Sequence, residues 1–182
     1  TSRLIFMTRR EVKISDLIVG DGHKVSFIAE IGVNHLGNYE RAKQMVDDAV
    51  EGGAEFIKFQ TYIAEKRYDK NNPKYKEFTD LVKEWQFSKD LESDLWNYAK
   101  SKGARVLTSV YDEESVDFAN SLETVAFKIA AFELNNKKLL KKVIEKKKPI
   151  IISCGMTNFD ETDELVRLLE IQEADFILLH TV

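Results

Sequence analysis

The sequence predicts an α/β protein of the (β/α)8 TIM-barrel class, with only the first six βα units present in this chain. One observation is that short apolar runs rich in Val, Ile and Phe alternate with helical or charged segments. The runs are 25–29, 55–59, 104–108, 125–130, 149–153 and 176–180. A second observation is that polar residues stand at the carboxyl end of every run. A barrel brings these ends to one face, whereas an open doubly wound sheet would recruit fewer strands to its site.

The segments between the runs carry helix caps. Asn38 is expected to begin the first helix, which Gly52 and Gly53 end. Further helices are predicted to begin at Ser88, near residue 113, at Asn136 and at Asp160. The region 61–87 has no clear period, so a substrate-covering loop and a plain insertion are both left open. We therefore expect residues 1–24 to be an N-terminal extension and residues 25–182 to form a partial barrel domain.

Composition narrows the class of partner. The formal net charge is −4, and the basic residues form no stripe with interleaved aromatics, so a nucleic-acid surface is not indicated. The single cysteine, Cys154, excludes an internal disulfide framework and is interpreted as a small buried residue. The chain has no apolar run long enough to span a bilayer and no secretory signal at its start. We expect a cytoplasmic protein that binds small molecules, with no membrane partner.

The polar groups at the strand ends suggest an anion site. They are Glu30, Lys58 with Gln60, Thr108 with Ser109, Lys128, Ser153 and His180. Lysine supplies a point charge for phosphate or carboxylate, and hydroxyl groups supply neutral donors that orient the ligand. Each has a structural alternative: lysines can extend along a sheet end toward water, and Ser153 can satisfy the backbone. His35 and His180 are interpreted as structural. No nucleotide-binding glycine motif is present.

Three blocks of sequence carry a resemblance. AEIGVNHLGNYERAKQMVDDAVEGGAEFIKFQT resembles the first βαβ unit of the sialic acid synthase family, with its EIGxNHxG and KFQ motifs. FKIAAFELNNKKLLKKVIEKKKPIIISCGM is similar to a later block of that family, and FILLHTV resembles the start of its LLH segment. The match covers residues 25 to 182, in order and with the family's spacing.

The resemblance implies a reaction. The family condenses phosphoenolpyruvate with N-acetylmannosamine or a related amino sugar to a nine-carbon 2-keto sugar acid and phosphate. A divalent metal assists, with Mn2+ expected and Mg2+ or Co2+ as alternatives. By motif position, the phosphoenolpyruvate ligands would be Lys58, Lys128 and Ser153, with Ser109 or Thr108 assisting. Glu30 would be the catalytic carboxylate and Gln60 would contact the sugar, while Asn34 and His35 would shape the loop behind Glu30.

Two departures from the family pattern qualify this hypothesis. Ala131 stands where the family has a serine, which removes one hydroxyl from the phosphate end of the site. The family's metal-ligand histidines lie in later blocks, so the metal ligands are expected beyond Val182 and His180 is not one of them. The family's C-terminal antifreeze-like domain, which underlies the expected homodimer, is also absent. We therefore predict that this chain holds half a site and is inactive alone.

Two alternatives remain open. The first is a related phosphoenolpyruvate-dependent synthase that makes a spore-coat, legionaminic or pseudaminic acid precursor. The second is a non-catalytic homologue or fragment that keeps the barrel half and has lost the chemistry.

Overall fold

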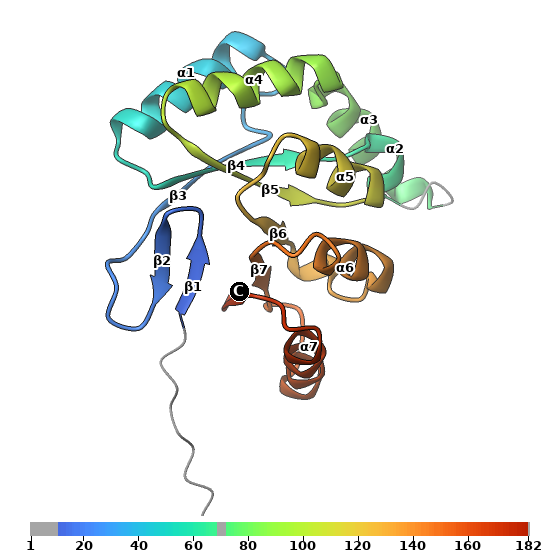
Figure 1. The fold of residues 1–182 in the computed structure, drawn as a ribbon. Helices are drawn as coiled ribbons and strands as arrows, with labels where there is room; N and C mark the ends of the chain where they lie inside the picture. The colour runs from blue at the N-terminus through green and yellow to red at the C-terminus, as the bar shows by residue number, and fades with distance from the viewer. Residues whose placement is uncertain (1–10, 69–71, 182) are drawn as a thin grey trace, which may run out of the picture.

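The structure, a computed structural model, describes residues 11–68 and 72–181. In this part of the chain a two-stranded sheet precedes a six-stranded sheet, whose strands are ordered as in the chain and are all parallel. The parallel strands are β3 (Ile28–Gly32), β4 (Phe56–Thr61), β5 (Arg105–Val110), β6 (Phe127–Ile129), β7 (Ile150–Ser153) and β8 (Phe176–Leu179). The predicted α/β fold with a parallel sheet is confirmed (Figure 1).

The first strand of this sheet lies later in the chain than predicted. We expected residues 25–29, but β3 begins at Ile28, and Val25 and Phe27 are 70% and 65% exposed. The Phe27 amide donates to the Glu55 carboxylate, and its carbonyl accepts from Phe56. Phe27 therefore leads the chain into the sheet without being part of it. As a consequence Glu30 lies within the strand, and its position in the sheet is fixed by pairing.

Helices follow most of the parallel strands. They are α1 (Tyr39–Glu51), α4 (Lys89–Ser101), α5 (Glu113–Ser121), α6 (Lys137–Ile144) and α7 (Phe159–Ile171). The predicted caps Asn38, Ser88 and Asn136 each accept a hydrogen bond from the first turn of their helix. The predicted start at Asp160 was wrong by two residues, because Asn158 and Glu161 form a reciprocal capping box. No helix in the described ranges is long and apolar enough to cross a membrane.

The region 61–87 folds as short helices. It contains α2 (Ala64–Arg67), a 3-10 turn η1 (Pro73–Tyr75) and α3 (Lys76–Trp85). The Tyr62 hydroxyl donates to the Val82 carbonyl over 2.8 Å, and the Gln86 side chain accepts from the Ala64 amide over 2.8 Å. These bonds hold the excursion against the carboxyl end of β4. The described part of this segment is therefore packed beside the strand ends where a site was predicted.

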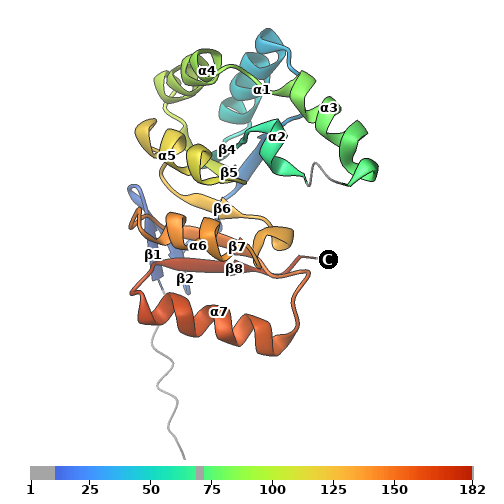
Figure 2. The same cartoon turned by 90° about the vertical axis from the view of Figure 1, so that its right-hand side faces the viewer.

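Side chains along the parallel strands alternate between two faces. The helix-facing set forms the main core together with apolar residues of the helices, and includes Ile57, Val106, Phe127, Ile152, Ala42, Leu95 and Leu139. Figures 1 and 2 show the sheet curving, with α1, α4, α5, α6 and α7 along its outer side. The other face of the sheet is therefore an inner face, as in a barrel wall.

A β-hairpin fills the base of this inner face. Strands β1 (Glu11–Ile14) and β2 (Leu17–Gly20) pair antiparallel, and Ile14 is buried against Phe56, Leu107 and Ile151. These partners lie toward the amino ends of their strands, so polar side chains on the same face are left near the carboxyl ends. Part of the predicted extension 1–24 thus packs on the domain; residues 1–10 lie outside the described ranges.

Candidate active site

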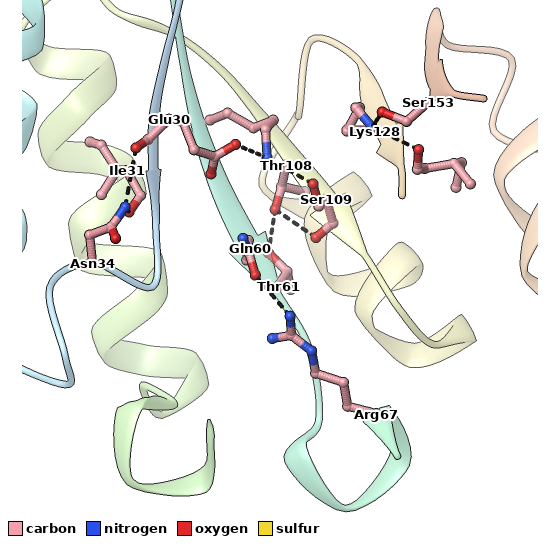
Figure 3. Close-up of polar contacts among 12 residues, drawn as sticks. Glu30, Ile31, Asn34, Gln60, Thr61, Arg67, Thr108, Ser109, Lys128 and Ser153 are labelled. Carbon is pink, nitrogen blue, oxygen red and sulfur yellow. Dashed lines mark hydrogen bonds and ion pairs between the residues drawn. The ribbon is translucent and has the colours of Figure 1, made fainter. Parts of the chain in front are cut away.

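Six of the predicted site residues share the inner face of the sheet. Glu30 is paired with Lys58 across β3 and β4, and Ser109 of β5 is paired with both Gln60 of β4 and Lys128 of β6. Ser153 ends β7 and reaches Lys128 by a side-chain hydrogen bond. Registered residues of parallel strands point to the same face. The sheet therefore brings together Glu30, Lys58, Gln60, Ser109, Lys128 and Ser153. Figure 3 labels all of these except Lys58.

Lys58 links a carboxylate to a hydroxyl. Its ammonium forms an ion pair with Glu30 and donates to Ser109 Oγ over 2.9 Å. The Lys58 side chain is 11% exposed, whereas that of Glu30 is 46% exposed. A buried ammonium needs such partners, because an unpaired charge is costly to remove from water. The buried lysine therefore fixes the position of the ion pair, and the more exposed glutamate can contact a ligand.

Lys128 is held differently. Its ammonium donates to Ser153 Oγ over 2.6 Å and to the Ile129 carbonyl over 2.8 Å, and no carboxylate of the described residues pairs with it. Burial, followed by the nearby charge of Lys58, lowers the pKa of Lys128 to about 8, although the Glu30 and Cys154 side chains oppose this. Near neutral pH the residue is therefore a mostly protonated cation whose charge an anionic ligand would neutralise.

Gly32 makes room for the carboxylate and the amide of the site. It has a φ of +51°, and a Cβ there would lie 2.7 Å from Glu30 Oε1 and 3.0 Å from Gln60 Nε2. The strand register shifts between Glu30 and Gly32, which places this turn directly at the end of β3. A side chain at position 32 would therefore displace Glu30 or Gln60.

Thr108 does not join this group. It is fully buried on the helix-facing side of β5, where its hydroxyl lies 3.0 Å from the Thr61 hydroxyl. Thr61 in turn donates to the Glu92 carboxyl of α4 over 2.5 Å, and burial raises the pKa of Glu92 to about 7. Successive residues of a strand point to opposite faces. Of the two hydroxyl residues proposed to assist, Ser109 therefore lies on the inner face and Thr108 does not. The expectation for Thr108 is corrected accordingly.

The histidines, Asn34 and Cys154 lie around this group without completing it. His35 stacks on Phe87 at 4.2 Å, its Nδ1 accepts from the Gly37 amide, and burial lowers its pKa to about 4, so it is neutral and structural. Asn34 donates to the Ile31 carbonyl and closes the turn after β3. His180 is exposed beyond β8, and the Cys154 thiol is half-buried with its pKa raised by burial.

The sequence reasoning did not single out Arg67 or Glu133. Arg67 Nη2 donates to Gln60 Oε1 over 3.2 Å from the end of α2 (Figure 3). Glu133 is buried in the turn η2 (Ala131–Glu133) after β6, accepts from Asn136, and has its pKa raised by burial. The position of Glu133 shortly after Lys128 in the sequence could have indicated it as a candidate site residue. Arg67 offered none, because its contacts are made through folding of the excursion.

The described residues do not form a metal centre. Within residues 11–68 and 72–181, no group of three or more His, Cys, Asp or Glu side chains is placed to hold an ion. Val182, beyond which the metal ligands were expected, lies outside these ranges, so that expectation stays a prediction.

The residue that departs from the family pattern follows Lys128 closely in the chain. Ala131 begins η2, three positions beyond Lys128. A methyl group at this position offers an anion no hydrogen bond. The hydroxyl beside Lys128 is instead that of Ser153, which accepts from the lysine across β6 and β7.

Comparison with known proteins decides the family. The model of the NeuB family matches residues 45–182. The chain belongs to the NeuB family. The resemblance to sialic acid synthases is thereby confirmed.

Two proteins of similar sequence and one solved structure can be compared with this NeuB chain. It is 36% identical over 173 residues to the uncharacterized protein MJ1065 of Methanocaldococcus jannaschii, covering 94% of this chain and 50% of that protein. It is 35% identical over 156 residues to the N,N'-diacetyllegionaminic acid synthase of Campylobacter jejuni, covering 80% and 47% respectively. The solved structure of the sialic acid synthetase of Leptospira borgpetersenii, in complex with citrate, matches with a TM-score of 0.88 and 28% identity, covering 94% of this chain and 59% of that one.

The NeuB chain spans about half the length of the curated relatives it matches. The structural match shows that its parallel sheet and helices have the arrangement found in a sialic acid synthetase. The restriction to six βα units and the division of the chain at residue 24 stay predictions.

Proposed function

We propose that this chain carries the phosphoenolpyruvate half of the active site of a sugar acid synthase. The enzyme would condense phosphoenolpyruvate with N-acetylmannosamine or a related N-acyl amino sugar, giving a nine-carbon 2-keto sugar acid and phosphate. The observation that carries the proposal is the pair of lysine ammonium groups on the inner face. Each donates to a serine hydroxyl of the following strand, Lys58 to Ser109 and Lys128 to Ser153.

These pairs suit an anion with two charged ends. Phosphoenolpyruvate carries a phosphate and a carboxylate, and the lysines would each neutralise one. A serine hydroxyl that accepts from a lysine keeps its own hydrogen free to donate to the ligand. Because both lysines are largely buried, their attraction for an anion is screened less than at the surface. Lysine and serine would thus fix both ends of phosphoenolpyruvate relative to β4 and β6.

The chemistry requires proton transfers near the bound enol. The C2=C3 electrons form a bond to the aldehyde carbon, and the aldehyde oxygen takes up a proton. Water then adds to C2 and loses a proton. The bond between C2 and the phosphate oxygen next breaks, the remaining proton of the added hydroxyl passes to the departing phosphate, and a ketone is left. Glu30 is the carboxylate available beside Lys58, and its half-exposed side chain is suited to take the proton from water. Gln60 would hold the amino sugar on the same face.

The acceptor is proposed at the level of a class. The relatives include an N,N'-diacetyllegionaminic acid synthase, N-acetylneuraminate-9-phosphate synthases and a pseudaminic acid synthase. The names of these relatives share an amino sugar acid as product and differ in its substituents. Divalent-metal assistance and a homodimer remain predictions from the resemblance, and a cytoplasmic location remains a prediction from the composition of the chain. The test below includes the metal ion as a condition.

The test is phosphate release from phosphoenolpyruvate by the product of the full reading frame, with Mn2+, Mg2+ or Co2+, and with or without N-acetylmannosamine. We expect release that depends on the sugar. Lys128→Met should lower kcat/KM for phosphoenolpyruvate by about 100-fold, because a desolvated charge contact is lost. Lys138→Met, on the exposed face of α6, is the matched control and should not change it. A folded product that releases no phosphate with any amino sugar would favour the non-catalytic homologue.

A further inference from the structure

Arg67 occupies an unusual place beside the site. Its guanidinium lies against two tyrosine rings, with Cζ 4.7 Å from the centre of Tyr62 and 4.2 Å from that of Tyr111. Nε and Nη1 are buried without a hydrogen-bond partner, whereas Nη2 donates to Gln60 Oε1 over 3.2 Å. We propose that Arg67 is a positioning residue, which orients the Gln60 amide so that its nitrogen serves as a donor for an oxygen of the amino sugar.

The direction of the amide follows from the chemistry of the two side chains. A guanidinium has donors and no acceptor, so Gln60 must present its oxygen to Arg67. The amide nitrogen then faces the other way. A Cβ on Gly32 would lie 3.0 Å from that nitrogen and 2.7 Å from Glu30 Oε1, so both groups border the same space above Gly32. Arg67 thus sets a donor beside the carboxylate proposed to act in the reaction.

Several contacts hold the guanidinium in this position. The two tyrosine rings are nearly perpendicular to each other, at 80°, and both attract the cation. A planar guanidinium can contact a ring face in a way that lysine would not reproduce. Tyr62 is itself fixed by its hydrogen bond to the Val82 carbonyl. Burial raises the pKa of Tyr62 and of Tyr111 to about 12, so both rings stay neutral at physiological pH. The two rings therefore hold the guanidinium in place, and its hydrogen bond is made to Gln60.

The arrangement differs from that of an arginine with a purely structural role. Such an arginine commonly engages a carboxylate with two parallel donors. Here no carboxylate among the described residues accepts from the guanidinium, and two buried donors are left unpaired at a cost in stability. The hydrogen bond to Gln60 is thus the feature that relates this cation to the site.

The inference rests on the proposed function. It says where the acceptor subsite has a hydrogen-bond donor and where it has an acceptor. An N–H donor beside a carboxylate acceptor suits a sugar hydroxyl, which accepts from Gln60 and donates to Glu30, and the N–H donor alone suits an N-acyl carbonyl. Without Arg67 the amide would be free to turn and present its oxygen instead. Loss of Arg67 should then weaken binding of the amino sugar and spare phosphoenolpyruvate.

A double-mutant cycle on the product of the full reading frame tests this. Arg67→Met should raise KM for the amino sugar about tenfold, the loss of one oriented hydrogen bond, with KM for phosphoenolpyruvate within about twofold. Gln60→Ala should do the same, and the double variant should be no worse than Gln60→Ala. Arg67→Lys should fall between wild type and Arg67→Met. Lys66 lies on the same helix as Arg67 and forms an exposed ion pair with Glu114. Lys66→Met removes this ion pair and should leave both constants unchanged.

The outcomes separate the two proposals. Sugar-dependent phosphate release by wild type with non-additive Arg67 and Gln60 effects supports both. Additive effects, or an equal rise of both KM values in a variant that melts like wild type, would overturn the positioning role and leave the synthase standing. If Arg67→Met fails to fold, the cycle is run with Arg67→Lys. No sugar-dependent release from the folded wild type would overturn the function and this inference with it.

Discussion

Glu30 and Lys58 are paired across β3 and β4, and their charged groups meet on the inner face of the sheet. The lysine is the buried partner and the glutamate the exposed one. Lys58 is therefore partly neutralised before any ligand arrives, while Lys128 is not. This asymmetry predicts that the two lysines, and the groups around them, respond differently to substitution and to pH.

Replacing Glu30 should affect the reaction more than binding. Glu30→Gln keeps the shape of the side chain and removes its charge, so Lys58 becomes more available to an anion. We expect kcat to fall by about 100-fold or more, as for loss of a general base, with phosphoenolpyruvate bound at least as tightly. Steady-state phosphate release and calorimetric titration measure the two quantities. Glu40→Gln, exposed on α1, is the control, and a Glu30→Gln enzyme of near wild-type kcat would contradict the role.

Phosphoenolpyruvate binding should weaken as pH rises through about 8. The pKa of Lys128 is lowered to about 8, so the free protein loses this positive charge above that pH. Because the anion prefers the protonated lysine, binding near this pH should be accompanied by proton uptake. Titrations in buffers of different ionisation enthalpy would detect the proton. Lys128→Met should bind weakly with a flatter pH profile, and an unchanged profile in that variant would exclude Lys128 as the titrating group.

Two glycines with positive φ provide a matched pair. Gly32 and Gly53 have φ of +51° and +77°, but a Cβ at Gly53 would meet nothing within 4 Å. Alanine at either position should cost about 1–2 kcal/mol of stability because the left-handed conformation disfavours a side chain. Gly32→Ala should in addition reduce activity, since it displaces Glu30 or Gln60. Thermal unfolding and phosphate release distinguish these effects, and equal activities of the two variants would argue against the crowding at Gly32.

Glu92 should make stability depend on pH on the side of the sheet away from the site. Burial raises its pKa from the ordinary 4.5 to about 7, so the folded protein binds the proton more tightly than the unfolded chain. Stability is therefore highest below about pH 4.5 for this group and is lost as pH rises through about 7. Glu92→Gln cannot ionise, so it should be more stable than wild type by about 1–3 kcal/mol at pH 8 and similar at about pH 4.

Denaturant unfolding at the two pH values tests the Glu92 prediction. A stabilisation of the same size at both would point to packing instead of ionisation. Glu164→Gln, which is exposed on α7, serves as the control because its carboxyl is already solvated.

The strand ends were predictable because apolar runs and polar terminators are local features. The choice between Thr108 and Ser109 was not made from the sequence, although their adjacency guaranteed that the strand would send them to opposite faces. The position of β3 was missed because Val25 and Phe27 have the composition of a strand but lie exposed before it. Arg67 could not have been found, since its contacts with Gln60 and Tyr111 depend on how α2 packs against β4 and β5.

The burial of Ile14 also has a consequence for synthesis of the chain. The hairpin that carries it can pair locally, but Phe56, Leu107 and Ile151, which cover its apolar side chain, are made later. Until β7 has left the ribosome, that surface stays uncovered and open to premature association or to chaperones. Docking of the hairpin is thus expected to be a late event of folding, although its residues precede those of the parallel sheet in the chain.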